Sequence, residues 1–169
     1  MKLTDYLLAE LERETRRSRA VLAEVPAGQY EWKPHEKSMK LGYLADMVAT
    51  IPTWIVLQVE KDELDIAPVD GARAPREPYT SSAALVEALD KALEAARAAL
   101  AASTDDHLSS NWKLKARGSV VQEAPRHEMI QDTFNHWAHH RGQLTVYLRL
   151  LGEKVAATYG PSADEQAFR

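Results

Sequence analysis

Three histidines lie within five residues towards the C-terminal end of the chain, at His136, His139 and His140. Imidazole nitrogens bind divalent ions such as zinc and nickel. Residues four apart on an α-helix lie on one face, with Cβ atoms about 5–6 Å apart. His136 and His140 can therefore share one metal ion, whereas His139 falls on another face. Because such sites usually take three or more protein ligands, the pair needs a partner from elsewhere in the chain.

The sequence around the histidines predicts a long helix. It begins near Arg126, directly after Pro125, and ends at Leu151, before a glycine in the position favoured just past a helix end. The apolar face of this helix carries Ile130, Thr133, Phe134, Trp137, Leu144, Leu148 and Leu151. His136 and His140 flank that face, so we expect them at or beside the protein interior. The simpler alternative is a pair of partly buried structural histidines that are hydrogen-bonded to neighbours.

Two amphipathic helices are predicted in the N-terminal part of the chain. The first covers residues 4–24, with Thr4 as its N-cap. The positions that face inward at three- to four-residue spacing are Leu7, Leu8, Leu11, Thr15, Ser18 and Leu22. The second covers residues 41–59 and contains Pro52. Since proline has no backbone N–H, we expect it to bend this helix or to remove one of its hydrogen bonds.

A long connection and a third helix follow. Residues 61–80 are rich in Asp, Pro, Gly and Arg without a periodic apolar pattern, which predicts a connection and not a regular element. Ser81 or Ser82 caps a third helix that runs to about residue 102. Residues 112–115 alternate briefly and can be extended, but this segment is too short to build a sheet alone.

Four helical segments in one chain predict an all-α fold, a four-helix bundle that forms a single domain over residues 1–169. The composition agrees, because 169 residues with 45% apolar and 27% charged side chains can build one sizeable core. Bundles of this class form metal sites from inward side chains on facing helices.

Composition also excludes several classes of function. The net charge is −4 and no basic stripe with aromatic residues occurs, so we expect no nucleic-acid partner. The chain has no cysteine, which excludes disulfides, thiolate metal ligands and a cysteine nucleophile. Because neither a signal peptide nor an apolar run of about 18 residues is present, we expect a cytoplasmic protein without membrane contact.

Several segments resemble the DinB-like family of small bacterial helical-bundle proteins. They are residues 135–151, the following Tyr159-Gly160-Pro161-Ser162-Ala163-Asp164-Glu165, and upstream the segments 32–35 and 41–54. The resemblance implies a four-helix bundle, usually a homodimer, with a metal held by one histidine of the second helix and two of the fourth. Related members are thiol-dependent transferases or isomerases that use the metal to activate a low-molecular-weight thiol. Many other members have no assigned activity.

His136 and His140 match the fourth-helix pair of that family, but the position of the second-helix histidine is occupied by Met47. The histidine triad is therefore incomplete. A neutral thioether is a poor ligand for divalent zinc, nickel or manganese, and Met47 lies on the apolar side of its helix, where its ordinary role is to fill the core. We expect a divalent metal, zinc or nickel, to be bound weakly or not at all.

Three other side chains are candidates for the missing ligand. Asp46 supplies a carboxylate next to Met47, but one residue along a helix is a rotation of about 100° to another face. His35 and His127 can in principle reach the site from a loop or from a helix start, although loop histidines are usually just solvated.

Two function hypotheses from different classes follow. In the first, the protein is a metal-dependent enzyme resembling thiol S-transferases, in which His136 and His140 bind the ion that activates a thiol or water towards a small electrophilic substrate. In the second, the metal has been lost and the chain is a non-catalytic dimeric binding or structural protein. Aromatic residues that can line a pocket in either case, or simply fill the core, are Trp54, Trp112, Trp137 and Tyr147.

The remaining charged residues predict structural roles. We expect Arg141 and Arg149, which lie beside Asp132 and Glu153, to form ion pairs on the helix surface or at a dimer interface, with anion binding by Arg141 as the alternative. The turn around Gly160 predicts a C-terminal tail that folds back over the helices, with Asp164 and Glu165 solvated.

Overall fold

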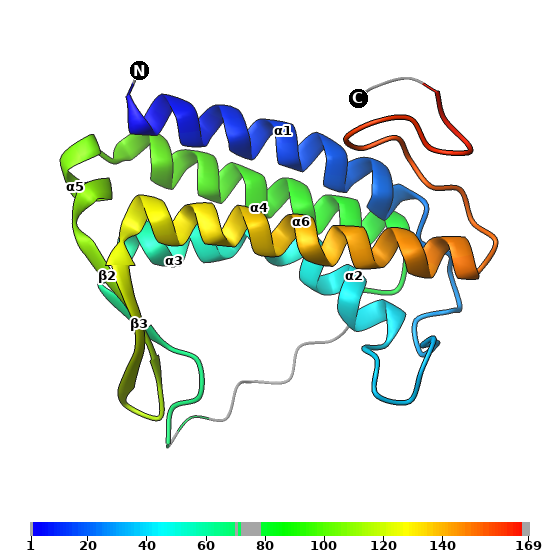
Figure 1. Ribbon diagram of the computed structural model, residues 1–169, viewed down its shortest axis with the longest axis horizontal. Helices are drawn as coiled ribbons and strands as arrows, with labels where there is room; N and C mark the ends of the chain where they lie inside the picture. Colours follow the sequence, from blue (N-terminus) through cyan, green and yellow to red (C-terminus); the bar gives the residue numbers. More distant parts are fainter. Residues whose placement is uncertain (1, 70, 72–78, 167–169) are drawn as a thin grey trace.

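A computed structural model of the chain describes residues 2–69, 71 and 79–166. Long helices pack around one apolar core, and a small sheet extends from one end of them (Figure 1). The elements in chain order are α1 (Leu3–Ala23), α2 (Leu41–Thr50), α3 (Pro52–Glu60), β1 (Glu63–Asp65), α4 (Ser82–Ala102), α5 (Asp105–Ser109), β2 (Asn111–Ala116), β3 (Ser119–Pro125) and α6 (Arg126–Leu150).

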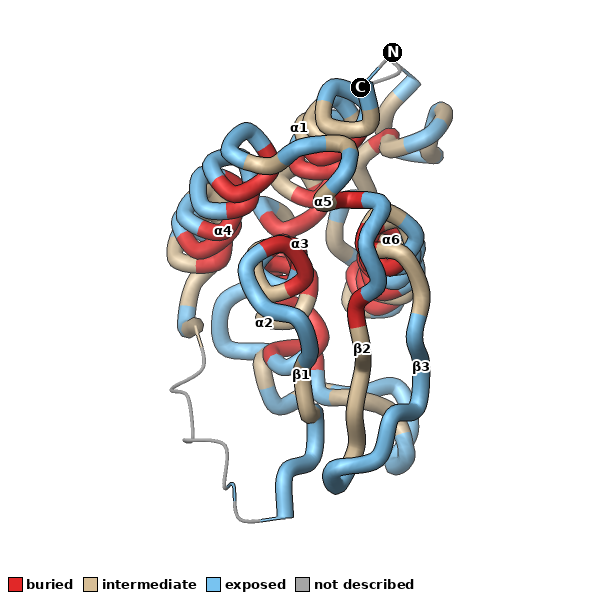
Figure 2. Tube along the Cα trace, turned by 90° about the vertical axis from the view of Figure 1, so that its left-hand side faces the viewer, coloured by how far each residue is buried: buried red, intermediate tan, exposed pale blue. Residues whose placement is uncertain are grey.

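The core lies where α1, α4, α6 and the α2–α3 pair face one another (Figure 2). Each helix buries residues at three- and four-residue spacing, which is the pattern expected of an amphipathic helix. On α4 the buried stripe includes Leu85, Leu89, Ala96 and Leu100. The predicted cap of this helix is confirmed, because the Ser81 side chain accepts a hydrogen bond from the amide of Ala84 at 3.1 Å.

Pro52 divides the predicted second helix, as the sequence indicated. Helix α2 ends at Thr50 and α3 begins at Pro52, with a bend of 46° between them. Proline cannot donate to the carbonyl of Val48, four residues earlier. The indole Nε1 of Trp137 on α6 donates to that carbonyl instead, at 2.7 Å. The carbonyl to which Pro52 cannot donate is thus hydrogen-bonded by α6, the helix that carries the histidines.

The N-terminus of α1 is capped differently from the prediction. Thr4 is not the N-cap, because α1 begins at Leu3, and the residue in the cap position, Lys2, makes no side-chain cap bond. The carboxylate of Asp105 accepts hydrogen bonds from the amides of Leu3 at 3.1 Å and Thr4 at 3.3 Å. A side chain from the start of α5 therefore satisfies the free amides of α1.

The fold is mostly helical, but the all-α prediction omitted a three-stranded sheet with the order β1-β2-β3. Strand β2 pairs in parallel with β1 and antiparallel with β3. The prediction that residues 61–80 form only a connection is wrong at β1, whereas positions 70 and 72–78 lie outside the described residues. The hairpin turn uses Arg117 and Gly118, both with positive φ, 52° and 77°. Two consecutive residues with positive φ are typical of a type I′ turn.

A buried arginine connects this sheet to the helices. Arg126 starts α6, is 2% exposed, and donates to the carbonyls of Asn111 at 2.6 Å and Lys61 at 3.1 Å. It also pairs with the carboxylate of Asp62 at 2.6 Å. These bonds fix the direction in which α6 leaves the sheet.

None of the helices that the structure describes is by itself long and apolar enough to cross a membrane. Among them, only the bent pair of α2 and α3 together has the length and composition for it.

Candidate functional site

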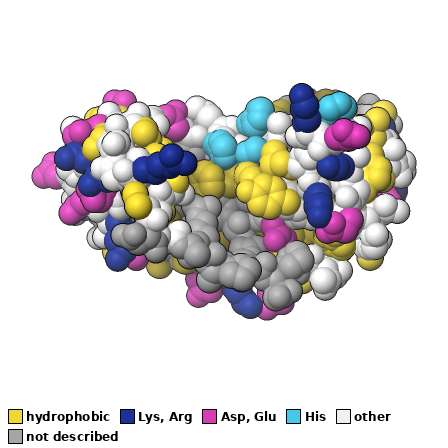
Figure 3. Space-filling model, turned by 90° about the horizontal axis from the view of Figure 1, so that it is seen from below, with side chains coloured by type: hydrophobic (Ala, Val, Ile, Leu, Met, Phe, Trp, Pro, Cys, Tyr) yellow, Lys and Arg dark blue, Asp and Glu magenta, His cyan; other side chains and the backbone are white. Residues whose placement is uncertain are grey.

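Helix α6 brings His136 and His140 together, as the four-residue spacing predicted. Their Nε2 atoms are 3.0 Å apart, and their ring centroids are 4.4 Å apart with the planes nearly perpendicular. The ring of His139 lies beside His140 at 5.1 Å, but it makes no bond through Nε2 to the pair. Histidine side chains gather beside hydrophobic ones on this face of the molecule (Figure 3).

Gln143 orients the pair, and the sequence prediction did not include it. Its Oε1 lies 2.8 Å from Nδ1 of His140, so the imidazole donates from Nδ1 to this amide oxygen. A neutral His140 then has its lone pair on Nε2 and accepts a hydrogen bond from Nε2–H of His136. The contact between His140 and Gln143 could have been predicted from the sequence, because a residue three positions after a histidine lies on the same helix face.

Both histidines favour the neutral state. Burial lowers the pKa of His136, and the neighbouring charges of His140 and His139 act in the same direction. Burial also lowers the pKa of His140, and this effect outweighs the hydrogen bond to Gln143, which raises it. His140 is only 7% exposed, whereas His136 is exposed. Neutral imidazoles are the form that binds metal ions.

Trp54 of α3 adds an aromatic surface to the pair. Its ring centroid lies 5.1 Å from that of His136 with the planes tilted by 32°, and the side chain is 39% exposed. The other three aromatic residues that could line a pocket lie in the interior. Trp112, Trp137 and Tyr147 are buried, so their role is packing. Of these four candidates, Trp54 is the one that is exposed and packs beside His136.

Neither Met47 nor Asp46 of α2 completes a metal site with the histidine pair. Met47 is partly buried and packs against the core, as predicted. Asp46 faces elsewhere, because its Oδ1 accepts from the amide of Tyr79 at 3.4 Å. Over the residues that the structure describes, no group of three or more His, Cys, Asp or Glu side chains is arranged to hold a metal ion.

The two distant histidines do not approach the pair. His35 lies in the exposed segment before α2, where its Nδ1 accepts from the amide of Lys37 at 3.1 Å. His127 is at the start of α6, with Nδ1 3.0 Å from the carbonyl of Leu108. Each ring is engaged locally, so neither completes the site.

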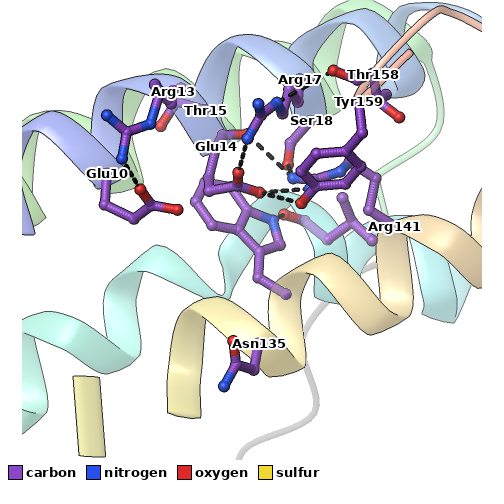
Figure 4. Close-up of polar contacts among 12 residues, drawn as sticks. Glu10, Arg13, Glu14, Thr15, Arg17, Ser18, Asn135, Arg141, Thr158 and Tyr159 are labelled. Carbon is purple, nitrogen blue, oxygen red and sulfur yellow. Dashed lines mark hydrogen bonds and ion pairs between the residues drawn. The ribbon is translucent and has the colours of Figure 1, made fainter. Parts of the chain in front are cut away.

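A buried ionic cluster lies next to the pair in sequence, and it corrects the prediction for Arg141. This arginine is 1% exposed and forms an ion pair with Glu14 of α1, which is 2% exposed (Figure 4). Arg141 also donates to the hydroxyl of Ser18 at 2.9 Å. Arg17 provides a second cation for the same carboxylate. Arg141 is therefore an internal link between α1 and α6, not a surface residue.

The C-terminal tail folds back over the helices, as predicted. The hydroxyl of Tyr159 accepts from Arg141 and donates to the carboxylate of Glu14 at 2.9 Å. Further along, Asp164 is not simply solvated, because it pairs with Arg149 and accepts from the amide of Val155 at 2.9 Å. The tail is thus fixed at two places along the helices.

The chain matches a protein-family model over nearly its whole length. The model of the DinB family matches residues 1–167. The chain belongs to the DinB family. A curated relative of this DinB-family chain, the uncharacterized protein YrdA of Bacillus subtilis (strain 168), is 32% identical over 99 residues. That match covers 56% of each chain, so it spans little more than half of the relative's length.

Solved structures share the fold of this DinB-family chain. A DinB-like protein from Bacillus cereus ATCC 10987 superposes with a TM-score of 0.69 at 21% identity, covering 90% of this chain and 95% of that one. A DinB-like protein, YjoA, from Bacillus subtilis gives 0.65 at 16% identity, with 96% and 99% covered. A member from Exiguobacterium sibiricum 255-15 gives 0.63 at 17%, with 92% and 96% covered.

Proposed function

We propose that this DinB-family protein binds one divalent metal ion, zinc or nickel, weakly through His136 and His140. The observation that carries the proposal is the 3.0 Å separation of the two Nε2 atoms. Two imidazoles on one tetrahedral zinc ion, at about 2.0 Å each, place their nitrogens about 3.3 Å apart. A small adjustment of the rings is therefore enough to replace the shared proton with a metal ion.

Gln143 supports this proposal. Metal-bound histidines usually donate their second N–H to a carbonyl or carboxylate, which fixes the tautomer and the ring orientation. The bond from His140 Nδ1 to Gln143 Oε1 has this form. His140 therefore presents an unprotonated Nε2 before any metal arrives, whereas His136 has to move its proton to Nδ1.

The donor set does not fit a complete divalent site. The two imidazoles are suitable, but Met47 occupies the position where the family resemblance implies a third histidine, and a thioether is a poor ligand for zinc or nickel. Weak affinity is the expected result.

The activity proposed for such a site is thiol-dependent S-transfer, with a low-molecular-weight thiol and a small electrophilic substrate as partners. Its support is the family resemblance together with the exposed face of Trp54 beside His136. We further propose that α2 and α3 count as one bent member of a four-helix bundle of the DinB-like type, that the protein is a homodimer and that it is cytoplasmic. Light scattering on the purified protein tests the dimer.

The alternative function is a non-catalytic dimeric binding or structural protein that has lost the metal. Two observations favour it. The histidines already satisfy each other through Nε2, and the described residues offer no cluster of three classical ligands. In this case the pair only helps to hold α6 beside α3.

Metal analysis followed by titration decides between these functions. The purified protein is expected to carry substoichiometric zinc or nickel, and Met47→His is expected to raise the affinity for both ions. His136→Ala should abolish binding, whereas His139→Ala, which removes a neighbouring ring outside the pair, should leave it unchanged. One tightly bound ion per chain in the unmodified protein would show that Met47 does not replace a lost ligand.

An activity assay addresses the enzyme hypothesis separately. Transfer of common bacterial thiols to small electrophiles is expected only after zinc or nickel is added. Rapid turnover in the presence of a strong chelator would exclude the metal-dependent enzyme. Metal binding without any transfer would favour the non-catalytic alternative.

A further inference from the structure

Residues 154–166, which we call the strap, leave the end of α6 in a fixed direction. The amide of Gly152 donates to the carbonyl of Arg149 at 3.2 Å, and the amide of Glu153 donates to the carbonyl of Leu148 at 3.0 Å. Gly152 has a φ of 81°. Together these features form a Schellman motif, which ends the helix and sets the path of the residues that follow. The strap then lies beside the C-terminal end of α1 (Figure 1).

The strap is closed on itself by hydrogen bonds of its own. The hydroxyl of Ser162 donates to the carbonyl of Val155 at 2.6 Å. The same hydroxyl oxygen accepts from the amides of Asp164 at 3.1 Å and Glu165 at 3.0 Å. The carboxylate of Glu165 in turn accepts from the amide of Ala157 at 2.8 Å. Because its two ends are bonded to each other, the strap is a compact loop that can keep its shape when it moves.

Tyr159 links this loop to two helices at once (Figure 4). Its hydroxyl donates to the carboxylate of Glu14 on α1 at 2.9 Å and accepts from Arg141 on α6. The guanidinium carbon of Arg17 lies 4.2 Å from the centroid of the Tyr159 ring, which is the geometry of a cation–π contact. Arg17 also donates from Nε to the carbonyl of Thr158 at 3.2 Å.

The contacts that hold the strap are polar and lie at the surface. Tyr159 is 55% exposed, although its hydroxyl reaches the buried ion pair. The strap also contacts α6 through the ion pair between Asp164 and Arg149, but the Arg149 side chain is 47% exposed, and such pairs contribute little to stability. Segments held in this way open locally, at a lower cost in free energy than global unfolding.

A cavity of about 330 Å³ lies between the strap and the end of α1. Its walls come from Ala20 and Ala23 of α1 on one side, and from Lys154 and Ala156 of the strap on the other. Because both sides contribute walls, the cavity has this form only while the strap is closed. A small molecule bound in it would therefore favour the closed state.

We propose that the strap opens and closes as one unit against α1 and α6, with Tyr159 as its latch. In the closed state the Tyr159 side chain covers the cluster of Glu14, Arg17 and Arg141. This cluster holds two arginines and one glutamate, so opening exposes one uncompensated positive charge. The proposal does not depend on the histidine pair or on metal binding.

Thiol labelling tests the opening, because the chain has no cysteine and a single introduced thiol is the only one to react. Ala157→Cys places this thiol in the strap, and Ala96→Cys places it in α4 as a matched control, since both alanines are 0% exposed. Buried thiols are inert until they are exposed. With a chromogenic disulfide reagent, the thiol at position 157 is expected to react at least about tenfold faster than that at position 96. Equal rates would show that the strap opens only on global unfolding, which would overturn the proposal.

The latch is tested in the Ala157→Cys background. Tyr159→Phe removes the hydroxyl that bonds to charged groups, and it is expected to raise the labelling rate about tenfold. Tyr159→Leu also removes the cation–π contact, which should add a further factor of about three. Tyr6→Phe is the control, because the hydroxyl of Tyr6 likewise joins α1 to α6, donating to Gln131 at 3.3 Å, and its loss should leave the rate unchanged. If neither substitution of Tyr159 changes the rate, Tyr159 is not the latch.

Hydrogen exchange tests whether the strap moves as one unit. The amide of Val155 donates to the carboxylate of Asp164 at 2.9 Å, and the amide of Ser162 donates to the carbonyl of Glu165 at 2.7 Å. All four residues belong to the strap, so these amides are expected to stay protected in Tyr159→Phe even though labelling becomes faster. Loss of their protection in that variant would show that the strap unfolds when it is released, and would overturn the motion as one unit.

Discussion

Trp137 donates its indole N–H to the carbonyl of Val48 across 2.7 Å. The residue four positions later is Pro52, which lacks an N–H. The break between α2 and α3 and the indole on α6 therefore form one structural unit. His136, the residue before Trp137, packs beside Trp54 of α3 with ring centroids 5.1 Å apart, so the histidine pair lies near the same break.

Trp137→Phe removes the donor but keeps most of the aromatic volume. It leaves the carbonyl of Val48 buried and unpaired, which is expected to lower the free energy of unfolding by about 1–3 kcal/mol. Urea denaturation measures the loss. Pro52→Ala supplies an N–H to the same carbonyl, so the Trp137 substitution should cost less in that background. Equal losses in the two backgrounds would show that the indole bond is not coupled to the proline.

Asp105→Ala tests the cap that α5 provides for α1. The carboxylate accepts from the amides of Leu3 and Thr4, so its removal is expected to cost about 1 kcal/mol of stability, as for other N-caps. Asp106→Ala is the control, since this exposed carboxylate has the same charge and lies one residue away in α5. Thermal unfolding and hydrogen exchange at the start of α1 report the effect. Identical exchange in both variants would mean that Asp105 does not cap α1.

Glu14→Gln is expected to lower stability at neutral pH by about 3 kcal/mol, because it leaves the charge of Arg141 buried without its partner. Burial of Glu14 raises its pKa, but Arg141 and the hydrogen bonds from Tyr159 and Arg17 outweigh this effect and lower it below the ordinary value of 4.5. The unfolded chain therefore takes up this proton first as the pH falls.

The pH dependence of that variant follows from the sign of the shift. A depressed pKa contributes stability that is fully present above pH 4.5 and is lost as the pH falls through the lower value of the folded protein. The difference in unfolding free energy between the unmodified protein and Glu14→Gln should hence shrink below pH 4.5. Glu10→Gln, one turn earlier and more exposed, serves as the control. A difference that stays constant down to pH 3 would contradict the depressed pKa.

Gly118→Ala tests the hairpin turn. A Cβ at this position meets nothing within 4 Å, so the whole cost comes from the positive φ of 77°. A left-handed conformation costs an L-residue about 1–2 kcal/mol, and the loss of stability should be of that size. Arg117→Gly removes the same penalty at φ 52° and is expected to protect the hairpin amides from exchange, not to expose them.

The parts of the structure that follow from local sequence were predictable. Helix α6 is one continuous segment, so the spacing of His136 and His140 alone determines that they share a face. Pro52 likewise acts within its own helix, and the predicted break is confirmed. Thr4 shows the limit of this approach, because the residue that actually caps α1 is Asp105, about one hundred positions away in the chain.

The parts that depend on distant partners could not be predicted. Strand β1 is a three-residue segment that pairs with β2 only because α4 and α5 return the chain to its side. Arg141 and Glu14 each look like solvated residues of an amphipathic helix, and only the packing of α1 on α6 brings them together in the interior.

The pairing of Glu14 with Arg141 has a consequence for folding during synthesis. The two residues are 127 positions apart, so α1 leaves the ribosome long before its partner is made. A carboxylate that is buried without its cation is strongly destabilising. Stable docking of α1 on the other helices is therefore expected only after α6 has been synthesised, and the early chain must keep its first helix hydrated until the C-terminal segment arrives.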